Sequence, residues 1–234
     1  MPDLFKGGEL NMSTEALAPS GAGLLWSDCA VNRWILIFNV IIFVIELSEI
    51  IRIYPQLIRC LSRWKGNQDL EHSVSLARTR NTVALVTGLA FCIMADRWGL
   101  VAPDFKLRLQ QGFQLPVTIG MIAATVLLRR LLYMTTQFRS RTSEYAQTLR
   151  HTIYNYQILL TSLMLLGVLP LTVFRVPDAA VRIVLYVECA VFYLLHLIRT
   201  GQILHSRCGT LATILYLCGL EILPVGILIF ACTL

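Results

Sequence analysis

Residues 151–174 read HTIYNYQILLTSLMLLGVLPLTVF and contain no Asp, Glu, Lys or Arg. At a rise of about 1.5 Å per residue, a helix of this length covers the roughly 30 Å of a bilayer's hydrocarbon core. Residues 109–128 form a second run without any of these four residue types. Because backbone groups in lipid must be hydrogen-bonded within their own segment, helix is the expected structure of both runs.

The composition extends this prediction to the whole chain. The 234 residues are 56% hydrophobic and 15% charged, with a mean hydropathy of +0.66, whereas an ordinary soluble domain carries about 25% charged residues. We therefore predict an all-α, polytopic transmembrane bundle of about six helices in residues 34–234, and a mobile extracytoplasmic tail in residues 1–33. The predicted spans are about 34–54, 81–101, 115–136, 153–174, 182–200 and 210–233.

The basic residues indicate an orientation. Thirteen of the 20 Lys and Arg residues lie in the first, third and fifth loops or in the halves of the spans that border them, and the positive-inside rule places these loops in the cytoplasm, with both termini outside. Because the Lys and Arg residues serve to set the membrane topology, we expect no nucleic-acid partner. Loops one and three, residues 59–80 and 137–152, are basic enough to bind lipid headgroups or dock a protein, although the more common role of such loops is to be solvated and to set the topology.

Charged side chains inside the apolar runs need partners, because each costs roughly 2.5–3.5 kcal/mol near the bilayer centre. Counted along the helices, Glu49 lies level with Arg129 and Arg130, and Glu188 lies within range of Arg97. We expect structural ion pairs at these positions, holding neighbouring helices together. The full set of ion-pair candidates is Glu49, Arg52, Asp96, Arg97, Arg129 and Arg130.

Two glutamates have no evident cation at their own depth. Glu46 falls near the middle of the first span and Glu221 near the middle of the sixth, three residues before Pro224. They are protonated acids bonded to each other or to backbone, acids facing a water cavity, or groups that exchange protons. Together with Glu188, they are our candidates for an ion, proton or substrate pathway.

Catalytic and cofactor motifs are missing from the sequence. It contains no HExxH, GxSxG or GxxxxGK[ST], and its seven cysteines form neither a CxxC pair nor a zinc-type Cys/His spacing. His196 and His151 are the pair that a bis-histidine haem would use, although a histidine at a helix end, such as His151, is more often an interfacial side chain. We expect no catalytic residue, no metal and no cofactor.

Three stretches carry a resemblance to a known family: LRHTIYNYQILL (149–160), VPDAAVRIVLYVECAVFYLLHLIRTGQIL (176–204) and LYLCGLEILPVGIL (215–228). The chain, over residues 30–234, resembles an uncharacterised family of six-helix inner-membrane proteins of Bacteroidota. This resemblance implies a bacterial inner membrane, so that the outside is the periplasm. It also draws attention to Glu221 and Pro224, but it implies no activity.

Three functions are compatible with these features. The first is a non-enzymatic inner-membrane subunit or assembly factor that binds another protein of the cell envelope, favoured by small size and the lack of a catalytic motif. The second is a small-solute or proton-coupled transporter or channel that uses Glu46 and Glu221. The third is an intramembrane enzyme acting on lipid, which the lack of an aspartate-rich diphosphate motif disfavours.

Overall fold

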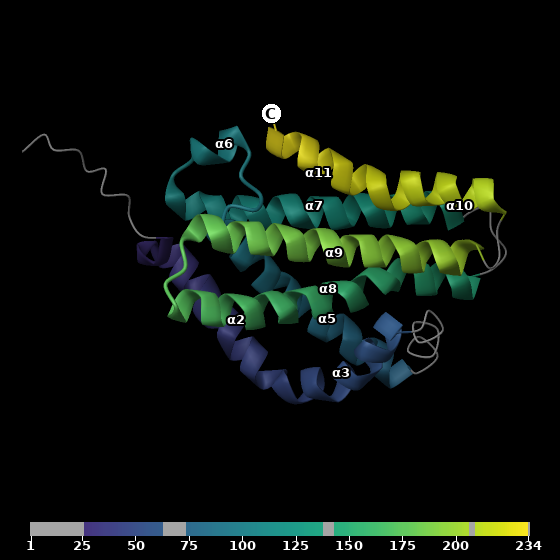
Figure 1. Ribbon diagram of the computed structural model, residues 1–234, viewed down its shortest axis with the longest axis horizontal. Helices are drawn as coiled ribbons and strands as arrows, with labels where there is room; N and C mark the ends of the chain where they lie inside the picture. Colours follow the sequence, from purple (N-terminus) through teal and green to yellow (C-terminus); the bar gives the residue numbers. More distant parts are fainter. Residues whose placement is uncertain (1–25, 63–73, 138–142, 206–208, 234) are drawn as a thin grey trace, which may run out of the picture.

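The computed structural model describes residues 26–62, 74–137, 143–205 and 209–233, and these residues form helices and no strand (Figure 1). Most of the predicted N-terminal tail (1–33) and parts of basic loops one and three lie outside the described residues. The elements are η1 (Trp26–Asp28), α2 (Ala30–Ile45), α3 (Leu47–Ser62), α5 (Val74–Arg97), α6 (Asp104–Leu107), α7 (Gln111–Gln137), α8 (Ser143–Val173), α9 (Asp178–His205), α10 (Thr210–Tyr216), η2 (Leu217–Ile222) and α11 (Leu223–Thr233).

Four helices are long and apolar enough to cross a membrane. They are α7, α8, α9 and the continuous helix formed by α10, η2 and α11. The pair α2 and α3 adds a fifth crossing if it is one span, although the chain bends by 69° between the two helices. These helices confirm the predicted all-α membrane bundle, and their length and composition support four or five crossings where we expected about six.

The remaining predicted span, 81–101, corresponds to α5, which starts and ends earlier, at Val74 and Arg97. This helix is the least exposed of the bundle, because α2, α3, α7 and α8 all pack against it. Its buried side chains include Arg80, Thr87 and Asp96. Polar side chains in a membrane bundle face its interior, where other helices supply partners, which explains why α5, packed against four helices, has a lower hydropathy than the outer helices.

The distribution of polar side chains is inverted relative to a soluble protein. Helix α2 buries Asn32 and Asn39 while exposing large apolar side chains such as Trp34, Phe38 and Ile45. In water such a surface would aggregate, whereas in a bilayer it faces lipid and the polar groups find partners inside. The Asn39 amide, for example, donates a hydrogen bond of 3.2 Å to the backbone carbonyl of Val86 on α5. The chain is therefore a membrane protein.

Helices α7, α8, α9 and α11 run side by side along the long axis of the molecule, whereas α2 crosses obliquely and α3 turns back toward that axis (Figure 1). The short helix α6 lies at the end of the bundle where α11 finishes. The bend between α2 and α3 falls at Glu46, and not at Pro55, which lies inside α3.

The last crossing is interrupted by a π-helical turn, η2, directly before Pro224. Proline has no backbone N–H and its ring clashes with the carbonyl four residues earlier, which is that of Leu220. A wider turn accommodates this clash, and such π-turns are frequent at functional sites. Glu221 lies within the turn and is buried.

Candidate functional site: a buried carboxylate between three helices

The carboxylate of Glu221 is the centre of a buried polar cluster. Arg129 donates two hydrogen bonds to it, from Nε to Oε2 at 3.0 Å and from Nη2 to Oε1 at 2.8 Å. The hydroxyl of Tyr133 donates to Oε1, and Nε2 of His196 lies 3.0 Å from Oε2. Since an ionised carboxylate only accepts hydrogen bonds, Nε2 must carry a proton. Each oxygen thus has two donors.

Helical spacing explains how three segments converge on one carboxylate. Arg129 and Tyr133 lie four residues apart on α7, so both point to the same face of that helix. On α9, Tyr193 and His196 are three residues apart, and the Tyr193 hydroxyl donates to the backbone carbonyl of Glu221 at 3.2 Å. This bond satisfies one of the carbonyl groups in the distorted turn η2.

The electrostatic balance of the cluster is set by one histidine. Glu221 and Arg129 have side-chain exposures of only 2% and 9%, and their charges cancel. The net charge of the cluster is therefore that of the His196 ring: zero when the ring is neutral and +1 when it is protonated. The second ring nitrogen, Nδ1, lies 3.5 Å from the Thr200 hydroxyl on the next turn of α9. The Tyr156 ring of α8 packs against the imidazole, with 5.5 Å between the ring centres.

A second buried carboxylate lies near one end of the bundle. Asp96, the penultimate residue of α5, pairs with Nζ of Lys106 at 2.7 Å. It also accepts hydrogen bonds of 2.7 Å from the Thr118 hydroxyl of α7 and from the Trp26 indole of η1. Lys106 donates a further bond to the backbone carbonyl of Val101. This cluster fastens α6 and the start of the described chain to the end of the bundle.

Several expected pairings are wrong. We expected Glu49 to bind Arg129 or Arg130, but Arg129 binds Glu221, and Arg130 is exposed on the neighbouring helical position. Within the described residues, Glu49 contacts Arg52, at 3.8 Å, and the Thr79 hydroxyl. The expectation that Glu221 has no cation at its depth is wrong for the same reason. Counting residues along the helices placed Arg129 level with Glu49 and not with Glu221, and such a count does not say which helices are neighbours.

The other predicted pair, Glu188 with Arg97, does not form among the described residues. Arg97 is exposed at the end of α5, while Glu188 points toward Gly167 of α8. Its Oε2 atom is buried and has no hydrogen-bond partner within the described part of the chain. Asp96, next to Arg97, takes its cation from Lys106.

The two mid-membrane glutamates are not brought together. Glu46 is half-buried at the bend between α2 and α3, and its side chain makes no hydrogen bond or ion pair with the described residues. Glu221 lies in the cluster formed by α7, α9 and η2. The idea that the two acids share a hydrogen bond is therefore wrong, and of the pathway candidates only Glu221 belongs to a polar network.

Sequence reasoning missed several members of these clusters, among them the Trp26 indole that donates to Asp96. It gave no role to Tyr133, although its spacing of four residues from Arg129 places both on one helical face. It also missed Lys106 and Thr118. The turn signals Gly99 and Pro103, between Asp96 and Lys106, could have indicated that the chain folds back there; Gly99 indeed adopts a positive φ of 63°.

The haem hypothesis finds no support in the geometry of His196. Its Nε2 faces Glu221 and its Nδ1 faces Thr200, so neither nitrogen points to an open space. His151 stacks on Tyr154 with 5.7 Å between ring centres. Within the described ranges, no three His, Cys, Asp or Glu side chains are grouped as a metal site would require.

Comparisons with protein-family models, with curated proteins and with solved structures find no significant match to this chain.

Proposed function

We propose that the chain is a non-enzymatic subunit or assembly factor of a protein complex in a bacterial inner membrane, with both termini in the periplasm. The observation that carries this proposal is the saturation of the Glu221 carboxylate. Both of its oxygens are occupied by donors from α7 and α9, so the acid joins helices and is not presented to a substrate. The second cluster, around Asp96, joins α5, α6, α7 and η1 in the same way.

The periplasmic orientation rests on the basic residues. Thirteen of 20 Lys and Arg residues lie in the first, third and fifth loops or in the halves of the spans that border them, and the positive-inside rule assigns these loops to the cytoplasm. A partner would then meet the bundle through its apolar outer surface or through basic loops one and three.

One observation favours a second candidate, a proton-coupled transporter or channel. Glu221 combines a π-helical turn with a histidine contact, and such turns are enriched at functional sites. Protonation of His196 or Glu221 would change the charge of a buried cluster and so alter the packing of α7, α9 and η2.

A purification experiment separates the two candidates. The full chain is purified from its native membranes in mild detergent as wild type, as Glu221→Gln and as the control Glu49→Gln, and the co-purifying proteins are identified by mass spectrometry. The scaffold proposal predicts a stoichiometric partner with wild type and Glu49→Gln, and parallel loss of abundance and partner with Glu221→Gln. An abundant, folded Glu221→Gln protein that loses only proton-coupled flux supports the transporter, and a partner-free wild type contradicts the scaffold.

A further inference from the structure

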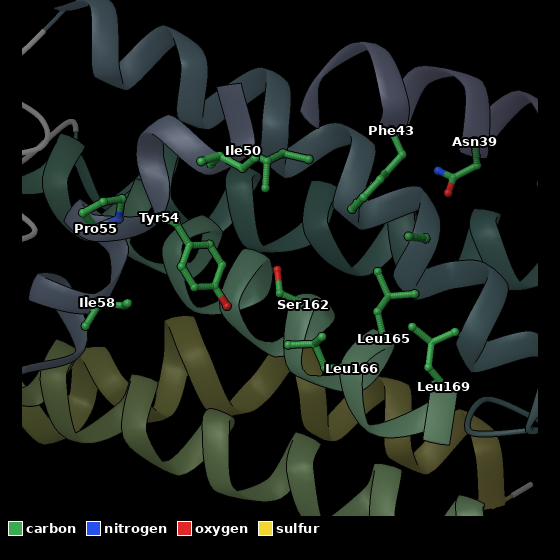
Figure 2. A pocket seen from close by; sticks show the side chains of 12 residues that line it. Asn39, Phe43, Ile50, Tyr54, Pro55, Ile58, Ser162, Leu165, Leu166 and Leu169 are labelled. Atoms are coloured by element: carbon green, nitrogen blue, oxygen red, sulfur yellow. The ribbon is translucent and has the colours of Figure 1, made fainter. Parts of the chain in front are cut away.

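An apolar cavity opens between α3 and α8, and none of its lining residues belongs to the Glu221 cluster. It has a volume of about 760 Å³ and is lined by residues of α2, α3, α5 and α8 (Figure 2). We call it the α3–α8 groove. Its lining residues are Asn39, Phe43, Ile50, Ile51, Tyr54, Pro55, Ile58, Ala90, Ser162, Leu165, Leu166 and Leu169.

The bend of the first crossing creates this groove. Helix α3 packs against both α5 and α8, whereas α2, after the 69° bend at Glu46, packs against α5 and α7 instead. The chain thus leaves the surface of α8 uncovered beyond the bend, where Leu165, Leu166 and Leu169 line the groove (Figure 2). Leu166 and Leu169 are exposed, so the groove opens sideways toward the lipid.

The groove contains one unused hydrogen-bond donor. The hydroxyl of Tyr54 points into the space and toward Ser162 (Figure 2), and it makes no hydrogen bond within the described part of the chain. Ser162 donates to the carbonyl of Ile158 at 2.8 Å, which leaves its oxygen able to accept. The amide of Asn39 is already engaged with Val86. Tyr54 is half-buried, and a phenol hydroxyl that faces hydrocarbon without a partner is unfavourable unless a bound molecule supplies an acceptor.

The depth of these hydroxyls restricts the chemistry of an occupant. Ser162 lies 11 residues from either end of the span His151–Val173, or about 16 Å along a helix. This position is close to the middle of a bilayer, where a charged headgroup would be strongly disfavoured. Phospholipid ester groups lie near the membrane surface, so a phospholipid chain in the groove would leave Tyr54 without an acceptor.

The size of the groove restricts the occupant further. Volumes of about 300–1,000 Å³ with mostly apolar walls and a few polar groups are typical of small-molecule sites. A partner helix is about 10–12 Å wide with its side chains, and a stable protein interface covers about 1,200–2,000 Å². The groove therefore has the size of a small-molecule site and not that of a protein–protein interface.

We propose that the α3–α8 groove binds a lipid of the membrane-quinone class, meaning an uncharged ring with carbonyl acceptors attached to a long apolar chain. The Tyr54 hydroxyl donates to a ring carbonyl, the Ser162 hydroxyl accepts from the reduced, hydroxyl-bearing form, and the chain leaves past Leu166 into the bilayer. The site is independent of the scaffold function proposed above, because it shares no residue with the Glu221 cluster.

Photo-crosslinking tests this site. The full-length protein is placed in nanodiscs of phosphatidylethanolamine and phosphatidylglycerol, exposed to a photoreactive isoprenoid quinone analogue, and the labelled residues are mapped by mass spectrometry. Label on α3 or α8 at the groove, displaced by unlabelled quinone but not by added phospholipid, is the expected result. Label that phospholipid displaces equally well, or label spread over all helices, overturns the proposal.

Three variants complete the test, with folding checked by size-exclusion chromatography. Leu166→Trp fills the groove and abolishes specific labelling, whereas Leu163→Trp, on α8 but outside the groove, leaves it unchanged. Tyr54→Phe lowers quinone affinity by about 5- to 10-fold, the amount expected for one hydrogen bond. Labelling that survives Leu166→Trp, or an unchanged affinity of Tyr54→Phe, contradicts the assignment.

Discussion

Arg129 on α7 donates two hydrogen bonds to Glu221, which lies 92 residues later in the chain, one to each oxygen of the carboxylate. Bidentate pairs of this kind are stronger and more directional than single hydrogen bonds. Both side chains are almost fully buried, so neither can exchange its partner for water. The pair therefore determines how α7 and the last crossing are rotated relative to each other.

Glu221→Gln should destabilise the bundle strongly. The substitution leaves the Arg129 guanidinium buried without a counter-charge, a change that typically costs about 3–5 kcal/mol. Thermal unfolding in dodecyl maltoside measures the effect. Glu49→Gln is the matched control, because the Glu49–Arg52 pair is largely exposed and exposed pairs contribute at most about 1 kcal/mol. Equal stability of the two variants would refute the structural role of Glu221.

Tyr133→Phe removes one of the four donors to the carboxylate while keeping the ring. A hydrogen bond to a charged group contributes about 1.5–3 kcal/mol, and we expect a loss of that size in denaturant unfolding. Tyr186→Phe is the comparison, since its exposed hydroxyl bonds only to the Leu100 carbonyl at 3.3 Å. If Tyr186→Phe were as unstable as Tyr133→Phe, the loss would follow from removing any tyrosine hydroxyl and not from the lost hydrogen bond to Glu221.

Asp96→Asn should loosen one end of the bundle without unfolding the centre. Lys106 would lose its only ion-pair partner among the described residues, and α6 would no longer be held by Asp96. Hydrogen–deuterium exchange should rise in α6 and at the start of α7, while α8 and α9 stay protected. Asp104→Asn, on an exposed position of α6, should leave exchange unchanged. Uniformly faster exchange in all helices would show that Asp96 has no local role.

The orientation can be tested with two single substitutions to cysteine. Asp104 on α6 and His205 at the end of α9 are both exposed and lie at opposite ends of the bundle (Figure 1). A membrane-impermeant maleimide should label Asp104→Cys in intact spheroplasts and His205→Cys only after permeabilisation, each measured against the parent chain. The reverse pattern would invert the proposed topology.

The fold class could be predicted because it depends on composition. Runs such as 151–174 are long enough to span a bilayer and have no soluble alternative that would hide them. Whether the α5 segment spans the membrane was harder to predict from hydropathy. Four helices pack against it, so that less of its surface faces lipid and fewer of its residues must be apolar. The bend at Glu46 was not predicted, since proline is the usual sequence signal for a kink and the bend does not lie at Pro55.

The candidate site was predicted only in part. Glu221 stood out because an acid inside an apolar run needs an explanation, but its partner Arg129 was assigned to Glu49. Sequence position along a helix gives depth, whereas pairing depends on which helices touch and how each is rotated. The π-turn before Pro224 alters that rotation for Glu221 itself, and although the proline marks where the helix is distorted, it does not reveal the direction in which Glu221 then points.

A double-mutant cycle on Arg129 and Glu221 tests the central claim most directly. Equilibrium unfolding in mixed micelles is measured for wild type, Arg129→Met, Glu221→Leu and the double variant. If the pair is a structural anchor, each single variant leaves a buried charge unpaired, and the double variant is more stable than the sum of the two losses predicts by at least about 2 kcal/mol. Losses that add within about 0.5 kcal/mol would contradict the account.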